Sequence, residues 1–143
     1  MTNLARNPRE LNDKSFDAEV LRSDIPVVVE FFTEWERPWR ALSREDWGIL
    51  NALYGEEIRC ACLDTGKNRT IAERYKVESI PNVFVFVGEK CVAQFFGKTR
   101  LSDVREAVER ALACVATAAK ETKLKTREIP RPSRSPLGTP SFA

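Results

Sequence analysis

The spacing of apolar and polar positions along the chain predicts alternating strands and helices. Runs rich in β-branched and aromatic residues, typical of strands buried on both faces, occur at 25–32 (IPVVVEFF), 57–64 (EIRCACLD) and 79–88 (SIPNVFVFVG). A fourth run, 90–97, follows the third after the turn Gly88-Glu89, so these two segments predict a β-hairpin. The polar segment around Leu11, which follows Pro8, predicts a short strand at the edge of the sheet.

Helical spacing occurs between these strands. Four segments predict helices: 13–23, 38–54, 69–76 and 100–120. Pro38 suits the first turn of the second helix, and Gly55 marks its expected end. The order β-α-β-α-β-α-β-β-α predicts an α/β fold with a mixed sheet, because the hairpin adds an antiparallel pair.

The composition changes at residue 121. The segment 121–143 contains four of the eight prolines and few large apolar residues. Such a segment buries too little apolar surface to offset the entropy lost on ordering, so we expect it to be disordered. We therefore expect a folded domain at 1–120 and a flexible, Pro-rich, basic tail at 121–143.

Charge and hydropathy exclude several classes of partner. The net charge of +2 is too small to indicate nucleic-acid binding. No apolar run approaches the roughly 20 residues needed to span a bilayer, and the first ten residues lack the apolar stretch of a secretory signal. We therefore expect a cytoplasmic protein with no membrane partner.

The four cysteines, Cys60, Cys62, Cys91 and Cys114, contain no CxxC pair. Histidine is absent, and the cysteine spacing does not match that of a zinc site, so we expect neither a metal nor a cofactor. In a reducing cytosol, the simplest interpretation is that these residues are buried free thiols.

Three stretches resemble segments of thioredoxins. SFDAEVLRSDIPVVVEFFTEW resembles the first helix and the strand that leads into the active site. AERYKVESIPNVFVFVGEK resembles the third helix, the cis-proline loop and the fourth strand, and FFGKTRLSDVREAVERAL resembles the closing glycine and helix. The resemblance covers roughly residues 9–113. It implies a thioredoxin fold, with a mixed five-stranded sheet flanked by four helices.

The resemblance also identifies a changed active-site motif. The family motif Trp-Cys-Gly-Pro-Cys-Lys aligns here with Trp35, Glu36, Arg37, Pro38, Trp39 and Arg40. Thioredoxins use the first cysteine to attack a disulfide and the second to resolve the intermediate. Because Glu36 and Trp39 can do neither, we expect a redox-inactive protein that is not an enzyme, unless a cysteine elsewhere substitutes.

Two acidic residues of this region have alternative interpretations. Glu36 is either a residue that favourably starts a helix or part of a remaining binding surface. Glu30 aligns with the buried acid that assists proton transfer in thioredoxins. Without the cysteines it is either a relic or one half of an internal ion pair.

The resemblance implies a peptide-binding groove formed by Trp35, Ile80 and Pro81, with the Ile80–Pro81 bond in the cis form. Tryptophan and arginine are enriched in interface hot spots, so we expect charged residues, including Arg40, around this groove. Trp39 alternatively turns into the core. The leading hypothesis is a protein-binding adaptor, assembly factor or chaperone-like partner that is either a monomer or a homodimer.

Two alternatives remain. Cys60 and Cys62 alternate on one face of a strand and lie about 6.5 to 7 Å apart, near the limit of disulfide reach. Together with a partly exposed Cys91, they suggest a non-standard thiol-disulfide oxidoreductase. The other alternative assigns the function to the tail, as a segment for interaction or assembly.

Overall fold

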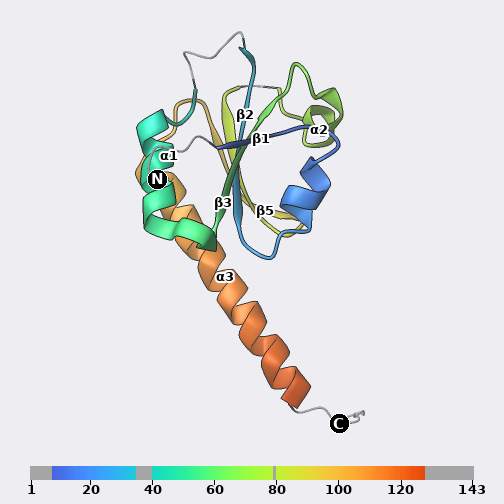
Figure 1. Ribbon diagram of the computed structural model, residues 1–143, viewed down its shortest axis with the longest axis vertical. Coiled ribbons are helices and arrows are strands. Elements are labelled where there is room, and N and C mark those ends of the chain that lie inside the picture. Colours follow the sequence, from blue (N-terminus) through green and yellow to red (C-terminus); the bar gives the residue numbers. More distant parts are fainter. Residues whose placement is uncertain (1–7, 35–39, 79, 128–143) are drawn as a thin grey trace. The chain divides into compact units, whose positions relative to one another are not determined.

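The computed structural model describes residues 8–34, 40–78 and 80–127, and only the main chain for the last nine of these (Figure 1). Its sheet has the strand order β1-β3-β2-β4-β5. The strands are β1 (Arg9–Leu11), β2 (Val27–Phe32), β3 (Arg59–Asp64), β4 (Asn82–Val87) and β5 (Lys90–Phe96). β1, β3 and β2 are parallel, whereas β4 pairs antiparallel with both β2 and β5. The predicted mixed five-stranded sheet is therefore confirmed.

Helices cover both faces of the sheet. They are the π-helix η1 (Asp17–Leu21), α1 (Arg44–Tyr54) with the 3-10 turn η3 (Gly55–Glu57), α2 (Arg69–Arg74) and α3 (Leu101–Arg127). Figure 1 shows α1 and the first half of α3 on one face, and η1 and α2 on the other. The four predicted helical segments are thus confirmed as elements, although only the end of α1 and the start of α2 lie where they were predicted.

Strand alternation divides the core into two clusters. Val28 of β2 faces α1 and α3 and packs in a cluster with Leu50 and Val108. Its neighbours Val27 and Val29 face the other way, toward η1 and α2. Every residue of β2 is buried, as expected for a strand covered on both faces.

The prediction that a helix begins at Pro38 is wrong for residues 40–43, which are not helical. α1 begins at Arg44 because Ser43 and Asp46 form a capping box. The Ser43 hydroxyl accepts from the Asp46 N–H at 3.0 Å, and the Asp46 carboxylate accepts from the Ser43 N–H at 3.2 Å. These bonds satisfy main-chain donors that a helix start otherwise leaves without partners.

The last helix extends past its predicted end. α3 reaches Arg127, seven residues beyond position 120. Contacts divide the chain into the units Met1–Ala113 and Cys114–Ala143. The sequence-based boundary between 120 and 121 remains a prediction. Within the described ranges, no helix is both long and apolar enough to cross a membrane.

Candidate functional site

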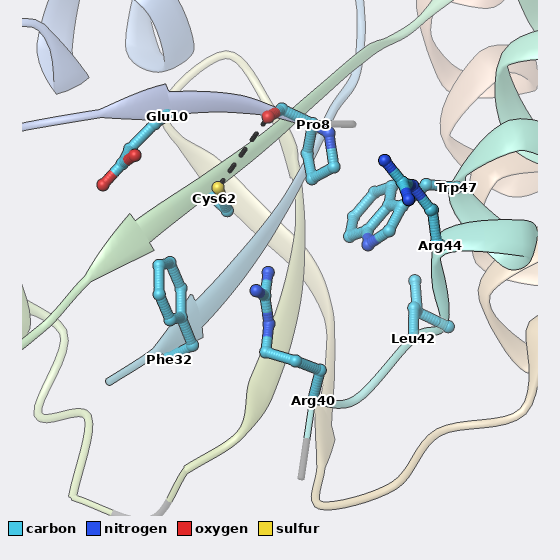
Figure 2. Close-up of a pocket in the computed structure, with 8 residues that line it drawn as sticks. All are labelled: Pro8, Glu10, Phe32, Arg40, Leu42, Arg44, Trp47 and Cys62. Atoms are coloured by element: carbon cyan, nitrogen blue, oxygen red, sulfur yellow. Dashed lines mark hydrogen bonds between the residues drawn. The ribbon is translucent and has the colours of Figure 1, made fainter. Parts of the chain in front are cut away.

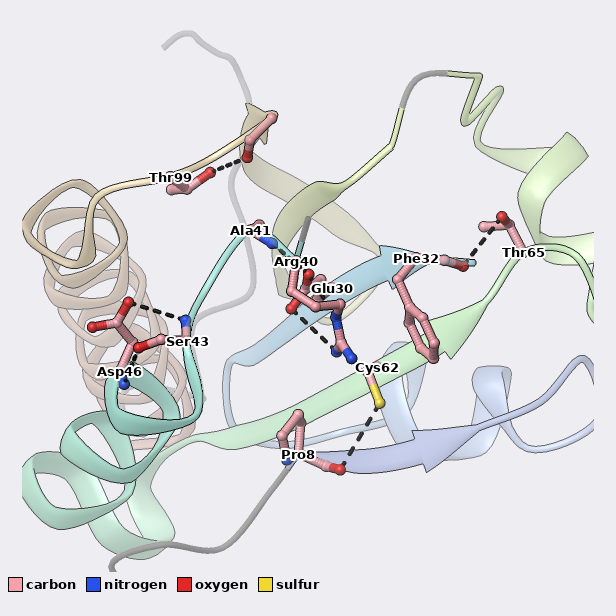
Figure 3. A network of polar contacts seen from close by, with 11 residues as sticks. Pro8, Glu30, Phe32, Arg40, Ala41, Ser43, Asp46, Cys62, Thr65 and Thr99 are labelled. Atoms are coloured by element: carbon pink, nitrogen blue, oxygen red, sulfur yellow. Dashed lines mark hydrogen bonds and ion pairs between the residues drawn. The ribbon is translucent and has the colours of Figure 1, made fainter. Parts of the chain in front are cut away.

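A buried ion pair joins Arg40, the last residue of the changed motif, to Glu30. Glu30 of β2 is fully buried (0% exposed) and faces the side of the sheet covered by α1. Its carboxylate accepts from the Arg40 Nε at 3.0 Å and Nη2 at 3.3 Å, and from the Ala41 N–H at 2.7 Å (Figure 3). Of the two interpretations of Glu30, the structure supports the internal ion pair. Three donors compensate the carboxylate for its lost hydration.

Arg40 is held in place from a second direction. Its guanidinium carbon lies 4.1 Å from the centre of the Phe32 ring, within the range of a cation–π contact. The side chain of Arg40 is only 24% exposed. The charge of Arg40 is therefore paired with Glu30, while the prediction that Arg40 lies near the groove remains a prediction.

Two thiols lie on the same face of β3, as predicted. Cys60 packs in the cluster with Val28, while Cys62 pairs in register with Glu30. The Cys62 Sγ donates a weak hydrogen bond to the Pro8 carbonyl at 3.9 Å. Burial raises the pKa of Cys60 to about 12. Burial also raises the pKa of Cys62 to about 11, although the nearby Arg40 acts to lower it. Both thiols are therefore protonated and poorly nucleophilic at neutral pH.

The other two cysteines, Cys91 and Cys114, are exposed. Cys91 lies in β5, and its Sγ donates to the Ala93 carbonyl at 3.2 Å. Partial burial raises the pKa of Cys91, while hydrogen bonds to the main chain at Ala93 and Val85 partly offset that rise. Cys91 is thus the most accessible thiol of the unit that contains the sheet.

The cis-proline segment lies against the end of β5, which carries an exposed aromatic residue. The Ile80–Pro81 peptide bond is cis, as expected, and Ile80 is half-buried. The Pro81 carbonyl accepts from the Gly97 N–H at 2.8 Å, so the end of β5 lies against Pro81. Phe96, the residue before this glycine, is 63% exposed. Among the residues that the structure describes, no hydrogen bond to the main chain of Ile80 is found.

Two of the three parts of the predicted site lie within the described residues, and the third does not. Arg40 joins Glu30, while Ile80 and Pro81 join Phe96. Trp35, Glu36, Arg37, Pro38 and Trp39 lie outside the described residues. Phe96 was missed, although alternation along the hairpin indicates it: Phe95 packs against the core, so its neighbour points away. Trp47 of α1 is only 2% exposed.

Comparison with known proteins places the chain in a family. The family model Thioredoxin matches residues 7–110. A chloroplastic M-type thioredoxin of Chlamydomonas reinhardtii is 30% identical over 105 residues, covering 71% of this chain and 72% of the relative. Thioredoxin 1 of a Nostoc species is 33% identical over 100 residues, covering 68% and 92%. A thioredoxin of Rickettsia bellii is 37% identical over 76 residues, covering 53% and 71%.

These matches correct one expectation. The conclusion that the chain is not an enzyme rested only on the residues at positions 36 and 39. It is contradicted because the matching family and the relatives named above are thioredoxins, which are oxidoreductases. The extent of the match, the mixed sheet and the cis-proline segment agree with one another. The chain belongs to the thioredoxin family.

Proposed function

We propose that this chain binds partner polypeptides along the edge formed by Ile80, Pro81 and Phe96, as an adaptor, assembly factor or chaperone-like partner. The proposal rests on two features of one edge: an exposed aromatic ring, and main-chain groups that have no hydrogen-bond partner among the described residues. Phe96 is 63% exposed beside Pro81, and no hydrogen bond to the Ile80 main chain is found among the described residues.

An extended partner segment fits this edge. The main chain of the partner would form hydrogen bonds with the main-chain groups of Ile80, as in strand addition. The side chains of the partner would pack on the Phe96 ring. Exposed aromatic rings are large contributors to binding energy when a partner buries them. Trp35, which lies outside the described residues, would extend the same surface, as the family resemblance implies.

The chemistry of the turn is part of the proposal. Glu36 and Trp39 stand where thioredoxins carry their two cysteines. A carboxylate cannot attack a disulfide sulfur, and an indole cannot resolve a mixed disulfide. We propose that the turn itself carries out no disulfide exchange and that partners bound there are released unchanged.

Substitutions that place a negative charge on the proposed edge test whether partners bind there. Phe96→Glu and Ile80→Glu are compared with Val92→Glu, which puts the same charge on another exposed apolar residue of β5. Partners captured with the wild-type chain are purified, and the affinity of each variant for them is measured by titration. We expect the first two variants to weaken binding roughly tenfold or more, and the control to leave it unchanged. Equal affinities for all four proteins would refute the proposal.

A second candidate function is disulfide exchange at Cys91, favoured by the exposure of this thiol and by the relatives named thioredoxins. The Cys91 thiolate would attack a substrate disulfide, forming a mixed disulfide and releasing one substrate thiolate. An added low-molecular-weight thiol such as glutathione would then attack that mixed disulfide. This attack on the substrate sulfur would release Cys91 as a thiolate and leave the substrate as a mixed disulfide with glutathione. A second glutathione would then attack the glutathione sulfur of that disulfide, which releases the substrate thiol and forms glutathione disulfide.

An insulin-reduction assay with glutathione separates the two candidates. If Cys91 exchanges disulfides, the wild-type chain accelerates reduction and Cys91→Ser does not, whereas Cys114→Ser behaves as the wild type. No acceleration by the wild-type chain would eliminate the second candidate and would leave the binding proposal unaffected.

A further inference from the structure

One side of α1 exposes two large apolar side chains. Ile49 is 43% exposed and Leu53 is 50% exposed. Because four positions separate them, they are neighbours on one side of the helix. On the opposite side, Trp47 is buried and points toward the strands (Figure 2). The exposed pair therefore faces away from the core, and it belongs to a different element from the edge at Phe96.

Acidic residues bracket this apolar pair. Glu45 lies one helical turn before Ile49, while Glu56 and Glu57 follow Leu53 in η3, and all three acids are exposed. Within the described ranges, no ion pair of these three carboxylates is found. Neither α1 nor η3 has a basic residue in its last turn, where the helix dipole disfavours negative charge. A cationic partner would relieve this repulsion. The two apolar residues and the three acids together form the α1–η3 face.

The chain itself contains a segment of complementary chemistry. α3 is one continuous helix to Arg127, whereas Ala111 is its last buried cluster member among the described side chains. Residues 120–127 (KETKLKTR), the basic segment, contain four basic residues, one acid and a single large apolar residue, Leu124. Lys120, Leu124 and Arg127 recur at helical spacing, so a base precedes and follows the apolar residue. The basic segment thus carries the opposite charges to the α1–η3 face, in which acids precede and follow the apolar pair.

We propose that the α1–η3 face binds the basic segment of a second copy of this chain. Leu124 packs on Ile49 and Leu53, and the bases on either side of it pair with the acids at the two ends of the face. Complementary charge sets which surfaces meet, while burial of the apolar residues stabilises the contact. This contact is independent of the polypeptide-binding edge.

The lengths of the two parts agree. Glu45 and Glu56 lie roughly 17 Å apart along the helix axis, and Lys120 and Arg127 lie roughly 10 Å apart. Lysine and arginine side chains are long enough to cover the difference at both ends.

The continuity of α3 indicates that a second copy supplies the segment. The basic segment belongs to the same helix as Val108, which packs in one cluster with Leu50 of α1. A continuous helix does not fold back on its own first turns. The basic segment is therefore available to the α1–η3 face of another chain.

Self-association of the full chain tests the proposal. Sedimentation equilibrium and light scattering measure the mass as the concentration rises, with a reducing agent present to prevent disulfides through the exposed Cys91 and Cys114. We expect the mass to rise above that of one chain, and high salt to reverse this rise because it screens exposed charges. A mass of one chain up to roughly millimolar concentration would overturn the proposal, including the case of a basic segment that contacts its own chain.

Charge reversal on each part assigns the contact. Glu45→Lys/Glu56→Lys reverses the ends of the α1–η3 face, and Lys120→Glu/Arg127→Glu reverses the basic segment. We expect each variant alone to associate roughly tenfold more weakly than the wild type, or less. An equimolar mixture of the two should regain association, because the segment of each variant then matches the face of the other.

Two matched controls separate this contact from general effects. Glu89→Lys/Glu106→Lys makes the same change in net charge at exposed acids outside the face, and it should associate as the wild type does. Leu53→Ser should weaken association roughly threefold to tenfold, whereas Val92→Ser, at an exposed apolar residue of β5, should not. Equal weakening by the face variant and its control, or no recovery in the mixture, would show that the proposed contact does not form.

Discussion

A carboxylate on the central strand needs compensation, and its partner comes from only ten residues further along the chain. Glu30 accepts from Arg40 through two nitrogens and from the Ala41 N–H, while the Phe32 ring lies against the guanidinium. The last residue of the changed motif is therefore anchored to the centre of the sheet. Arg40 also lies close to Cys62, where its charge acts to lower the pKa of that thiol against the larger effect of burial.

Removing one partner of this pair should be costly. Arg40→Met leaves Glu30 buried without a counter-charge, and we expect a loss of about 3 kcal/mol in the free energy of unfolding. Urea denaturation measures this. In the double variant Glu30→Leu/Arg40→Met, no charge remains buried, so most of the stability should return. A double variant no more stable than Arg40→Met would show that the pair does not act as we describe.

The buried thiols predict a dependence of stability on alkaline pH. The folded pKa values of about 12 for Cys60 and about 11 for Cys62 lie above the unfolded value of about 8.5. Above that pH the unfolded chain binds fewer protons than the folded one, so stability is complete below about pH 8.5 and falls as pH rises toward 11.

Each thiol should contribute about 1.4 kcal/mol of loss per pH unit within that window. Urea denaturation at about pH 7.5, 9 and 10 measures the slope. The variant Cys60→Ala/Cys62→Ala lacks both thiols. We expect its free energy of unfolding to fall less steeply with pH than that of the wild type, by about 2 to 3 kcal/mol per pH unit. Parallel slopes would contradict the assigned pKa shifts.

The late start of α1 shapes the site at the level of elements. Because residues 40–43 are not helical, the Ala41 N–H is available to Glu30, and the Ala41 carbonyl accepts from the Thr99 N–H at 3.1 Å. Ala41 and Leu42 both enter the core beneath α1. The linking segment is thus tied to β2 on one side and to the start of α3 on the other.

The capping box should contribute measurably to this arrangement. Ser43→Ala removes the acceptor for the Asp46 N–H, and we expect a loss of about 1 kcal/mol in unfolding free energy. Ser43→Thr retains a capping oxygen and should lose much less. Both are measured by urea denaturation, and equal losses for the two variants would argue against the cap.

At the scale of the whole molecule, the folded core ends well before the chain does. The buried members of the two apolar clusters, among the described residues, lie between Leu11 and Ala111. Among the described side chains of α3, those after Ala111 are not buried members of either cluster. The hypothesis that the tail mediates interaction or assembly, and the choice between a monomer and a homodimer, concern the whole molecule rather than one site.

Truncation after Lys120 tests this separation. Because it removes no residue of either cluster, we expect the free energy of unfolding to change by less than about 0.5 kcal/mol. Light scattering on both chains gives their mass, and a fall from dimer to monomer would assign association to the removed segment. Loss of captured partners together with an intact Phe96 edge would favour the tail hypothesis over our proposal.

Strong local patterns made much of the fold predictable. The apolar runs at 25–32 and 79–88 predicted buried strands. The short turn Gly88-Glu89 predicted that the run at 79–88 forms a hairpin with the run at 90–97. The start of α1 was misplaced because Pro38 outweighed the capping signal of Ser43 and Asp46. Phe96 and the inward turn of Arg40 were missed because both depend on neighbours from other elements.

The sequence by itself determined the strand and helix order, the family, and the absence of cysteine from positions 36 and 39. The order of elements follows from local periodicity, the family from the resemblance of stretches along residues 7–110, and the missing cysteines from residue identity, none of which needs knowledge of distant contacts. Only the tertiary structure decided that Arg40 neutralises Glu30, that the end of β5 with the exposed Phe96 bonds to Pro81, and that the Trp47 N–H is buried without an acceptor among the described residues. Burial, charge pairing and exposure are properties of neighbours brought together by folding, so no single stretch of sequence contains them.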